Sequence, residues 1–273
     1  RYSLTNPEAA NLKTNTTGSN NFASGSQSLF NNTTGSHNIA TGFASLYANT
    51  TGDFNVAFGE MTLTNNTIGS SNIGIGRAAL YYNTTGNGNV AHGFQSLYSN
   101  TTGSQNTSNG VNSLYTNTTG NQNTANGFFA LRSNTTGTEN TASGSAALSS
   151  NNIGNENTAS GSNALTSNTS GMKNTASGYR ALYYNSSGGH NTANGSSALL
   201  SNTTGIKNTA NGFEALYYNS TGILNTAVGA SAGPNSGINP SNFTAIGYYA
   251  GHVGSNSNTV EIGNQSVTWI GGQ

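Results

Sequence analysis

The chain has 273 residues, of which only 5% are charged, 32% are hydrophobic and 37 are glycine, a composition typical neither of a compact globule nor of a highly charged disordered segment. Seven basic and seven acidic residues give a net charge of zero, so nucleic acid is not expected as a partner. Without cysteine the chain has no disulfide or thiolate metal site, and no apolar run is long enough to predict insertion into a membrane.

Residues 1–14 precede the first regular unit and are predicted to form an N-terminal cap or linker. Their sequence, RYSLTNPEAANLKT, lacks the basic start and apolar stretch of a secretory signal peptide. Export would therefore require a signal outside this sequence or a different secretion machinery.

Residues 15–229 consist of thirteen repeats of 17 residues. Glycines recur at this interval without a slip, a second glycine series runs from Gly25 to Gly229, and leucines recur from Leu12 to Leu216. Such a constant register predicts a solenoid, in which each unit contacts its neighbours in one fixed way. The first glycine series comprises Gly18, Gly35, Gly52, Gly69, Gly86, Gly103, Gly120, Gly137, Gly154, Gly171, Gly188, Gly205 and Gly222.

Each repeat reads N-T-T-G-x-x-N-T-A-x-G-x-x-A-L-x-x, which is too short and too rich in Gly, Asn and Thr for a pair of helices. A Thr, Val or Ile column, with Val56 and Thr124 as examples, predicts a β-strand, and Asn-Thr-Thr-Gly predicts a turn whose Gly takes a positive φ. Strands stacked about 4.8 Å apart would give these coils a length of roughly 60 Å. Because two glycines per coil suggest two corners, we predict an all-β, parallel β-solenoid of the flattened, two-sided β-roll type.

Two asparagine columns are predicted to support this stack. One begins with Asn15 and Asn32, the other with Asn21 and Asn38. Amides one coil apart can hydrogen-bond in ladders along the solenoid axis. Many Asn-Thr-Thr stretches also match the N-glycosylation sequon, but a turn explains them more simply.

Residues 230–273 are predicted to form an irregular C-terminal β cap or adaptor. In NTAVGASAG (225–233) and FTAIGYYAG (243–251), glycine occupies the former leucine position, and PNSGINPSN is inserted between them. The last stretch, SNTVEIGNQSVTWIGGQ, alternates like a pair of strands and holds the only tryptophan, Trp269. Atypical terminal units of this kind are expected at the end of a solenoid.

The apolar content of one coil predicts that the chain assembles with copies of itself. Each repeat offers one Leu and one or two Ala; burying a Leu is worth roughly 2 kcal/mol, against an ordering cost of about 1–2 kcal/mol for every residue. Aromatic residues recur after the second glycine, as at Phe43, and after the leucine, as at Tyr47. Burial of these columns between chains predicts a homotrimer, intertwined or side by side. The alternative is an exposed aromatic stripe on a monomer.

The motifs NTAVG, FTAIG and NTVEIG resemble the head repeats of trimeric autotransporter adhesins, which are β-rolls that intertwine as trimers. The ending NTVEIGNQSVTWIGGQ also resembles the segment of bacteriophage tail fibres and related surface fibres that precedes a self-cleaving, endosialidase-type intramolecular chaperone domain. The resemblance covers residues 15–272, although the adhesin head repeat is shorter than the repeat here. It implies an extracellular fibre segment on a virion, a phage-tail-like particle or a cell surface.

The expected function is therefore that of a structural fibre that mediates attachment to a host receptor, with a glycan as one such receptor. Exposed tyrosines stack on sugar rings, whereas buried ones would form the core of the trimer. No catalytic residue, metal site or cofactor is predicted, and the chain is not expected to be an enzyme. The candidate glycan-binding residues are Tyr81, Tyr82, Tyr98, Tyr115, Tyr183, Tyr184, Tyr217 and Tyr218.

An ice-binding solenoid is the alternative function, because threonines from Thr107 to Thr226 align in one column. Two features oppose this alternative. The residue two positions before each threonine varies, with Gln105 and Glu156 as examples, and earlier coils place Val or Ile in the threonine column, which suits a half-buried position.

A glycan-cleaving tail spike is a less favoured alternative. It would rest on Glu139 and Glu156, which share a position in adjacent repeats, about 5 Å apart if stacked, as in a retaining glycosidase. The same column continues to Lys173, so a solvated line of mixed charge is the simpler interpretation.

Overall fold

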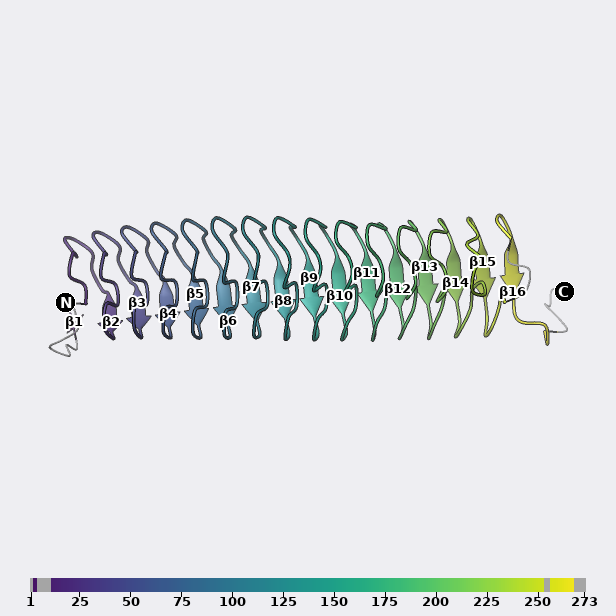
Figure 1. Cartoon of the computed structure of the whole chain (residues 1–273), viewed down its shortest axis with the longest axis horizontal. Coiled ribbons are helices and arrows are strands. Elements are labelled where there is room, and N and C mark those ends of the chain that lie inside the picture. The colour runs from purple at the N-terminus through teal and green to yellow at the C-terminus, as the bar shows by residue number, and fades with distance from the viewer. Residues whose placement is uncertain (1, 4–10, 253–255, 268–273) are drawn as a thin grey trace, which may run out of the picture. The chain divides into compact units, whose positions relative to one another are not determined.

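The computed structural model of the chain describes residues 2–3, 11–252 and 256–267. Two compact units are present, Arg1–Glu139 and Asn140–Gln273, and all regular elements among the described residues are short β-strands. The first unit contains β1 (Tyr2–Ser3), β2 (Phe22–Ser24), β3 (Ile39–Thr41), β4 (Val56–Phe58), β5 (Ile73–Ile75), β6 (Val90–His92), β7 (Thr107–Asn109) and β8 (Thr124–Asn126) (Figure 1). The second contains β9 (Thr141–Ser143), β10 (Thr158–Ser160), β11 (Thr175–Ser177), β12 (Thr192–Asn194), β13 (Thr209–Asn211), β14 (Thr226–Val228), β15 (Thr244–Ile246) and β16 (Val260–Ile262).

Within each unit, every strand pairs in parallel with the next strand along the chain. In the first unit Val56 is the register partner of Ile73, and in the second Thr158 is the partner of Thr175. Each repeat position therefore stacks on the same position of the next 17-residue coil. The predicted all-β, parallel β-solenoid is confirmed in both units.

Only one side of each coil is a strand, which differs from the predicted two-sided roll. The rest of the coil is a series of turns, in which three non-glycine residues adopt left-handed backbone conformations, with φ of 59° at His37, 52° at Ala44 and 50° at Leu46 in one coil. Such residues interrupt the extended backbone that a second strand would need. The buried leucines with positive φ have no signature in the sequence, because leucine rarely adopts this conformation.

The two glycine columns have different causes, which corrects the turn prediction. The glycine of Asn-Thr-Thr-Gly does not have a positive φ; a Cβ at Gly35 would instead lie 2.5 Å from both Oδ1 of Asn32 and the carbonyl oxygen of Gly52. The second column does have a positive φ, 122° at Gly42. The first glycine is thus required by the close approach of neighbouring coils, and the second by its backbone conformation as well.

The core of each unit is closed within a single chain. The leucine of the repeat is fully buried, as at Leu46 and Leu182, together with the alanine in the middle of most strands, as at Ala40 and Ala176. The residues on either side of that alanine point outward, as the alternation of a β-strand requires.

The predicted asparagine ladders are confirmed in both columns. In the first unit the amide of Asn66 donates to Oδ1 of Asn49 at 2.8 Å, and both the backbone and side-chain nitrogens of Asn55 donate to Oδ1 of Asn38, at 2.9 and 3.2 Å. These side chains are fully buried. Their amide nitrogens are therefore closed to a glycosyl donor once the chain has folded.

The sheet of the second unit continues beyond residue 229, because β15 and β16 pair in parallel after β14. Gly251 stands at a leucine position, and the fully buried Phe243 stands where the asparagine column would continue. A Cβ at Gly251 would lie 2.5 Å from Cζ of Phe243, so the two departures from the repeat compensate each other. Trp269 lies outside the described residues.

The N-terminal segment also contributes to the sheet of its unit. Tyr2 and Ser3 of β1 are the register partners of Phe22 and Ala23. Of the predicted cap at 1–14, residues 1 and 4–10 lie outside the described part of the chain.

Candidate binding sites

Four of the predicted tyrosines form one cluster in the first unit. The rings of Tyr81, Tyr98 and Tyr115 stack one coil apart, with centroids 5.3 and 5.1 Å from one another along the column. Tyr82 stands edge-on against both Tyr81 and Tyr98. The stacked rings are half-buried and Tyr82 is exposed, so the cluster presents ring edges and hydroxyls to solvent.

The cluster perturbs the ionisation of Tyr98. Burial raises its pKa above the ordinary value of 10.0, and so do a hydrogen bond with Tyr82 and the neighbouring phenols of Tyr82, Tyr115 and Tyr81. The phenol of Tyr98 therefore stays protonated at any physiological pH.

The other four predicted tyrosines form two separate pairs in the second unit. Tyr183 and Tyr184 contact each other edge-on with centroids 4.7 Å apart, and so do Tyr217 and Tyr218. The first pair lies among regular coils. The second pair lies at the end of the regular repeats, where it lines a cavity.

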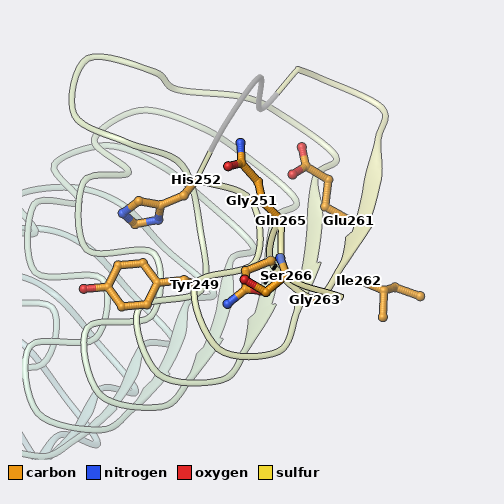
Figure 2. Close-up of a pocket in the computed structure, with 9 residues that line it drawn as sticks. Tyr249, Gly251, His252, Glu261, Ile262, Gly263, Gln265 and Ser266 are labelled. Carbon is orange, nitrogen blue, oxygen red and sulfur yellow. Dashed lines mark hydrogen bonds between the residues drawn. The ribbon is translucent and has the colours of Figure 1, made fainter. Parts of the chain in front are cut away.

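Two cavities adjoin each other at this end of the second unit. The smaller, of about 190 Å³, is lined by Glu214, Tyr217, Tyr218, Ser231, Ala232, Gly233, Pro234, Tyr249 and His252. The larger, of about 600 Å³, is lined by Tyr249, Gly251, His252, Glu261, Ile262, Gly263, Asn264, Gln265 and Ser266 (Figure 2). Tyr249 and His252 line both cavities, and their rings contact each other with centroids 4.7 Å apart.

Sequence reasoning missed Tyr249 and His252 as site residues. The Tyr-Tyr dipeptide at 248–249 matches the dipeptides at 183–184 and 217–218, but it follows the second glycine of its coil, whereas the other pairs follow the leucine. The repeated Tyr-Tyr dipeptide could have identified Tyr249 as a candidate, but its different position in the coil excluded it from the aligned tyrosine column.

The outward face of the sheet differs in character between the two units. In the first unit β3–β5 expose Ile39, Phe58, Ile73 and Ile75. In the second unit β9–β11 share the sequence Thr-Ala-Ser, in which Thr and Ser face outward and only Ala is buried. The threonine column is half-buried at Thr107 and Thr124, as predicted, and exposed at Thr141, Thr158 and Thr175. Its outward neighbour on the same strand lies two residues after each threonine.

Glu139 and Glu156, the two acidic residues considered for catalysis, lie in different units, and no contact between them is described. Glu139 belongs to the first unit and Glu156 to the second. Glu156 lies 3.7 Å from Nζ of Lys173, and both side chains are about half exposed, as predicted for a solvated column of mixed charge. Within the described residues, no group of three or more His, Asp or Glu side chains could hold a metal ion.

No family model matches this chain, and the comparison with curated proteins found no match. None of the described residues forms a helix that could span a membrane. The candidate sites are therefore interpreted from their geometry.

Proposed function

We propose that this chain is a structural segment of an extracellular fibre, on a phage-tail-like particle or a cell surface, that holds an attachment surface. The observation that carries the proposal is the constant bonding between coils: the register of β-pairing and both asparagine ladders recur through the regular coils of each unit. A stack of this kind is stiff, because each coil is bonded to its neighbours through backbone and side chains alike. The resemblance to trimeric adhesin heads supports the same assignment.

We further propose that three chains assemble side by side. The aromatic column after the second glycine supports this proposal, because Phe43, Phe94 and Phe128 of the first unit have 40–50% of their surface exposed. Between Phe43 and Phe94 the same column holds Glu60 and Arg77, which form an exposed ion pair at 3.3 Å. Exposed aromatic rings on either side of such a pair are typical of a surface that is covered by a partner. A homotrimer would bury this column about its axis.

Light scattering on the intact chain tests the assembly. The expected mass is three times the chain mass of 27.8 kDa, and replacement of Phe43, Phe94 and Phe128 together by serine should yield monomers. Phe54→Ser is the matched control, because Phe54 is also exposed but lies in a different column. A monomeric wild-type chain at micromolar concentration would contradict the trimer.

Ice binding is a second candidate function, and the sheet face of the second unit favours it. Outward threonines recur on β9–β13, each followed by an outward serine or asparagine, and no charged residue interrupts either column. The result is a regular array of methyl and hydroxyl groups with a spacing of about 4.8 Å between strands. Such an array matches an ordered solid better than a flexible ligand.

A thermal hysteresis assay distinguishes this candidate from the fibre. If the face binds ice, Thr158→Lys combined with Thr175→Lys should abolish hysteresis, because charge disrupts the array. Ser187→Lys combined with Thr204→Lys, both exposed in a different column of the same unit, should leave it unchanged. Absence of hysteresis in the wild-type chain would remove the candidate.

A further inference from the structure

The two adjoining cavities at the C-terminal end of the second unit coincide with a specific change in the repeat. The leucine column is interrupted at Gly233 and Gly251, and the ring of Phe243 fills the space beside Gly251. Cβ atoms at these two glycines would lie 3.0 Å from Cα of Leu216 and 2.5 Å from Cζ of Phe243, respectively. The backbone therefore passes close to the core, and the hollow lies outside it, bordered by side chains of the turns and of β16.

The side chains around the hollow combine flat aromatic rings with polar groups. Tyr218 and Tyr249 are 42% and 40% exposed, so both keep an accessible surface. Glu214 supplies a carboxylate to the smaller cavity and Glu261 supplies one to the larger. Neither cavity has a lysine or arginine in its lining.

His252 supplies a further indication of a ligand. It lines both cavities, and its Nδ1 atom is buried without a hydrogen-bond partner among the described residues. A buried polar atom without a partner costs free energy, and a rotation of the ring that brings Nδ1 to a ligand hydroxyl in the cavities would recover that cost.

We infer that these cavities form a binding site for a neutral oligosaccharide, with Tyr249 as the stacking platform between two sugar positions. A pyranose has an apolar face that packs on an aromatic ring and hydroxyls that donate to carboxylates, which are the two kinds of group the site offers. The smaller cavity, of about 190 Å³, accommodates one ring, and the larger one extends the site beyond Tyr249 and His252. The absence of lysine and arginine from the lining disfavours sialic acid and other acidic sugars.

This inference rests on the proposed attachment function and names the class of receptor. It also restricts the predicted glycan-binding residues to Tyr217 and Tyr218, since neither lining includes the tyrosines of the regular coils. The paired rings at Tyr183 and Tyr184 have nearly the same mutual geometry and provide an internal control.

The test is saturation-transfer NMR on the intact chain with maltotriose, cellotriose and chitotriose, each at about 10 mM, a concentration that detects millimolar affinity. At least one trisaccharide should receive saturation, and Tyr249→Ala should weaken its binding roughly tenfold or more, as loss of a central aromatic anchor does. Glu214→Gln, which preserves shape, should weaken binding by a smaller factor. Tyr184→Ala, in the exposed control pair, should leave binding unchanged.

Three results would overturn the sugar site: no saturation of any trisaccharide, binding that survives Tyr249→Ala, or equal loss with Tyr184→Ala. Preferential binding of choline, a cation that also favours tyrosine and carboxylate, would overturn the sugar as ligand. Light scattering on the same samples separates the two proposals. A trimer that binds none of the trisaccharides contradicts only the proposed sugar site, whereas a monomer that binds one of them contradicts only the trimeric fibre.

Discussion

The side-chain amide of Asn100 donates to Oδ1 of Asn83 at 2.7 Å and to the carbonyl oxygen of Gly103 at 2.8 Å. One buried side chain thus links the preceding coil to the turn of its own coil. Its oxygen in turn accepts a hydrogen bond from the amide of Asn117 at 2.8 Å. Each asparagine of the ladder is therefore a structural crosslink, which explains why the column is nearly invariant along the chain.

Replacing Asn100 by alanine should destabilise the first unit by about 2–5 kcal/mol, because one hydrogen-bonded rung is lost and the polar groups of its neighbours remain buried without partners. Thermal or urea unfolding followed by circular dichroism measures the change. Asn109→Ala is the control: its amide donates to Oδ1 of Asn126 at 2.9 Å, but both side chains are exposed, so the cost should stay within about 0.5 kcal/mol. Equal costs at both sites would show that the buried ladder has no special role.

The first glycine column allows a test of close packing between coils. Gly35→Ala should destabilise strongly, because the new Cβ would lie 2.5 Å from two oxygens and one coil would have to move away from the next. Gly88→Ala should cost only about 1 kcal/mol, since nothing but Cγ of Gln105 lies within 4 Å of that Cβ. Melting temperatures of the two variants should therefore differ clearly. If Gly35→Ala and Gly88→Ala lowered the melting temperature equally, close packing between coils would not explain the first glycine column.

The fold was predictable from the sequence because its determinants are periodic. The constant glycine and leucine intervals predict a solenoid, and the asparagine columns predict ladders that the structure contains. The path of the coil was not predictable, because leucines such as Leu46 adopt a left-handed φ of 50° that no sequence rule assigns to leucine.

The predicted trimer rested on an incomplete account of the core of one chain. That account counted apolar side chains, whereas the buried asparagines contribute hydrogen bonds that link neighbouring coils within each unit. Of the candidate site, Tyr217 and Tyr218 were identified from their position in the repeat. Tyr249 and His252 were not, because the cavities they line depend on the interruption of the repeat, where periodic reasoning no longer applies.

The ionisation of Tyr98 should depend on Tyr82. Because the pKa of Tyr98 is raised in the folded chain, its contribution to stability is fully present below the ordinary pKa of about 10 and is lost as pH rises through the higher folded-state pKa. Tyr82→Phe removes a hydrogen bond and a neighbouring phenol, so the pKa of Tyr98 should fall toward its ordinary value. NMR titration of ring-labelled tyrosine measures this shift, and an unchanged titration curve would contradict the role of Tyr82.

Phe243 and Gly251 should be energetically coupled, because the ring of one occupies the space that a side chain at the other would need. Phe243→Asn restores the ladder residue but leaves a cavity at the leucine position, with an expected cost of about 3–5 kcal/mol. Gly251→Leu alone should also destabilise, since its Cβ would lie 2.5 Å from Cζ of Phe243.

The double variant recreates the regular pattern of Asn and Leu, in a column where leucine already tolerates a positive φ. It should therefore be more stable than the sum of the single changes predicts, by about 1–3 kcal/mol of coupling energy. Urea unfolding of the four chains measures the cycle. Additive costs would mean that Phe243 and Gly251 are not coupled. The packing at the end of the solenoid would then not depend on the ring of Phe243 filling the space beside Gly251.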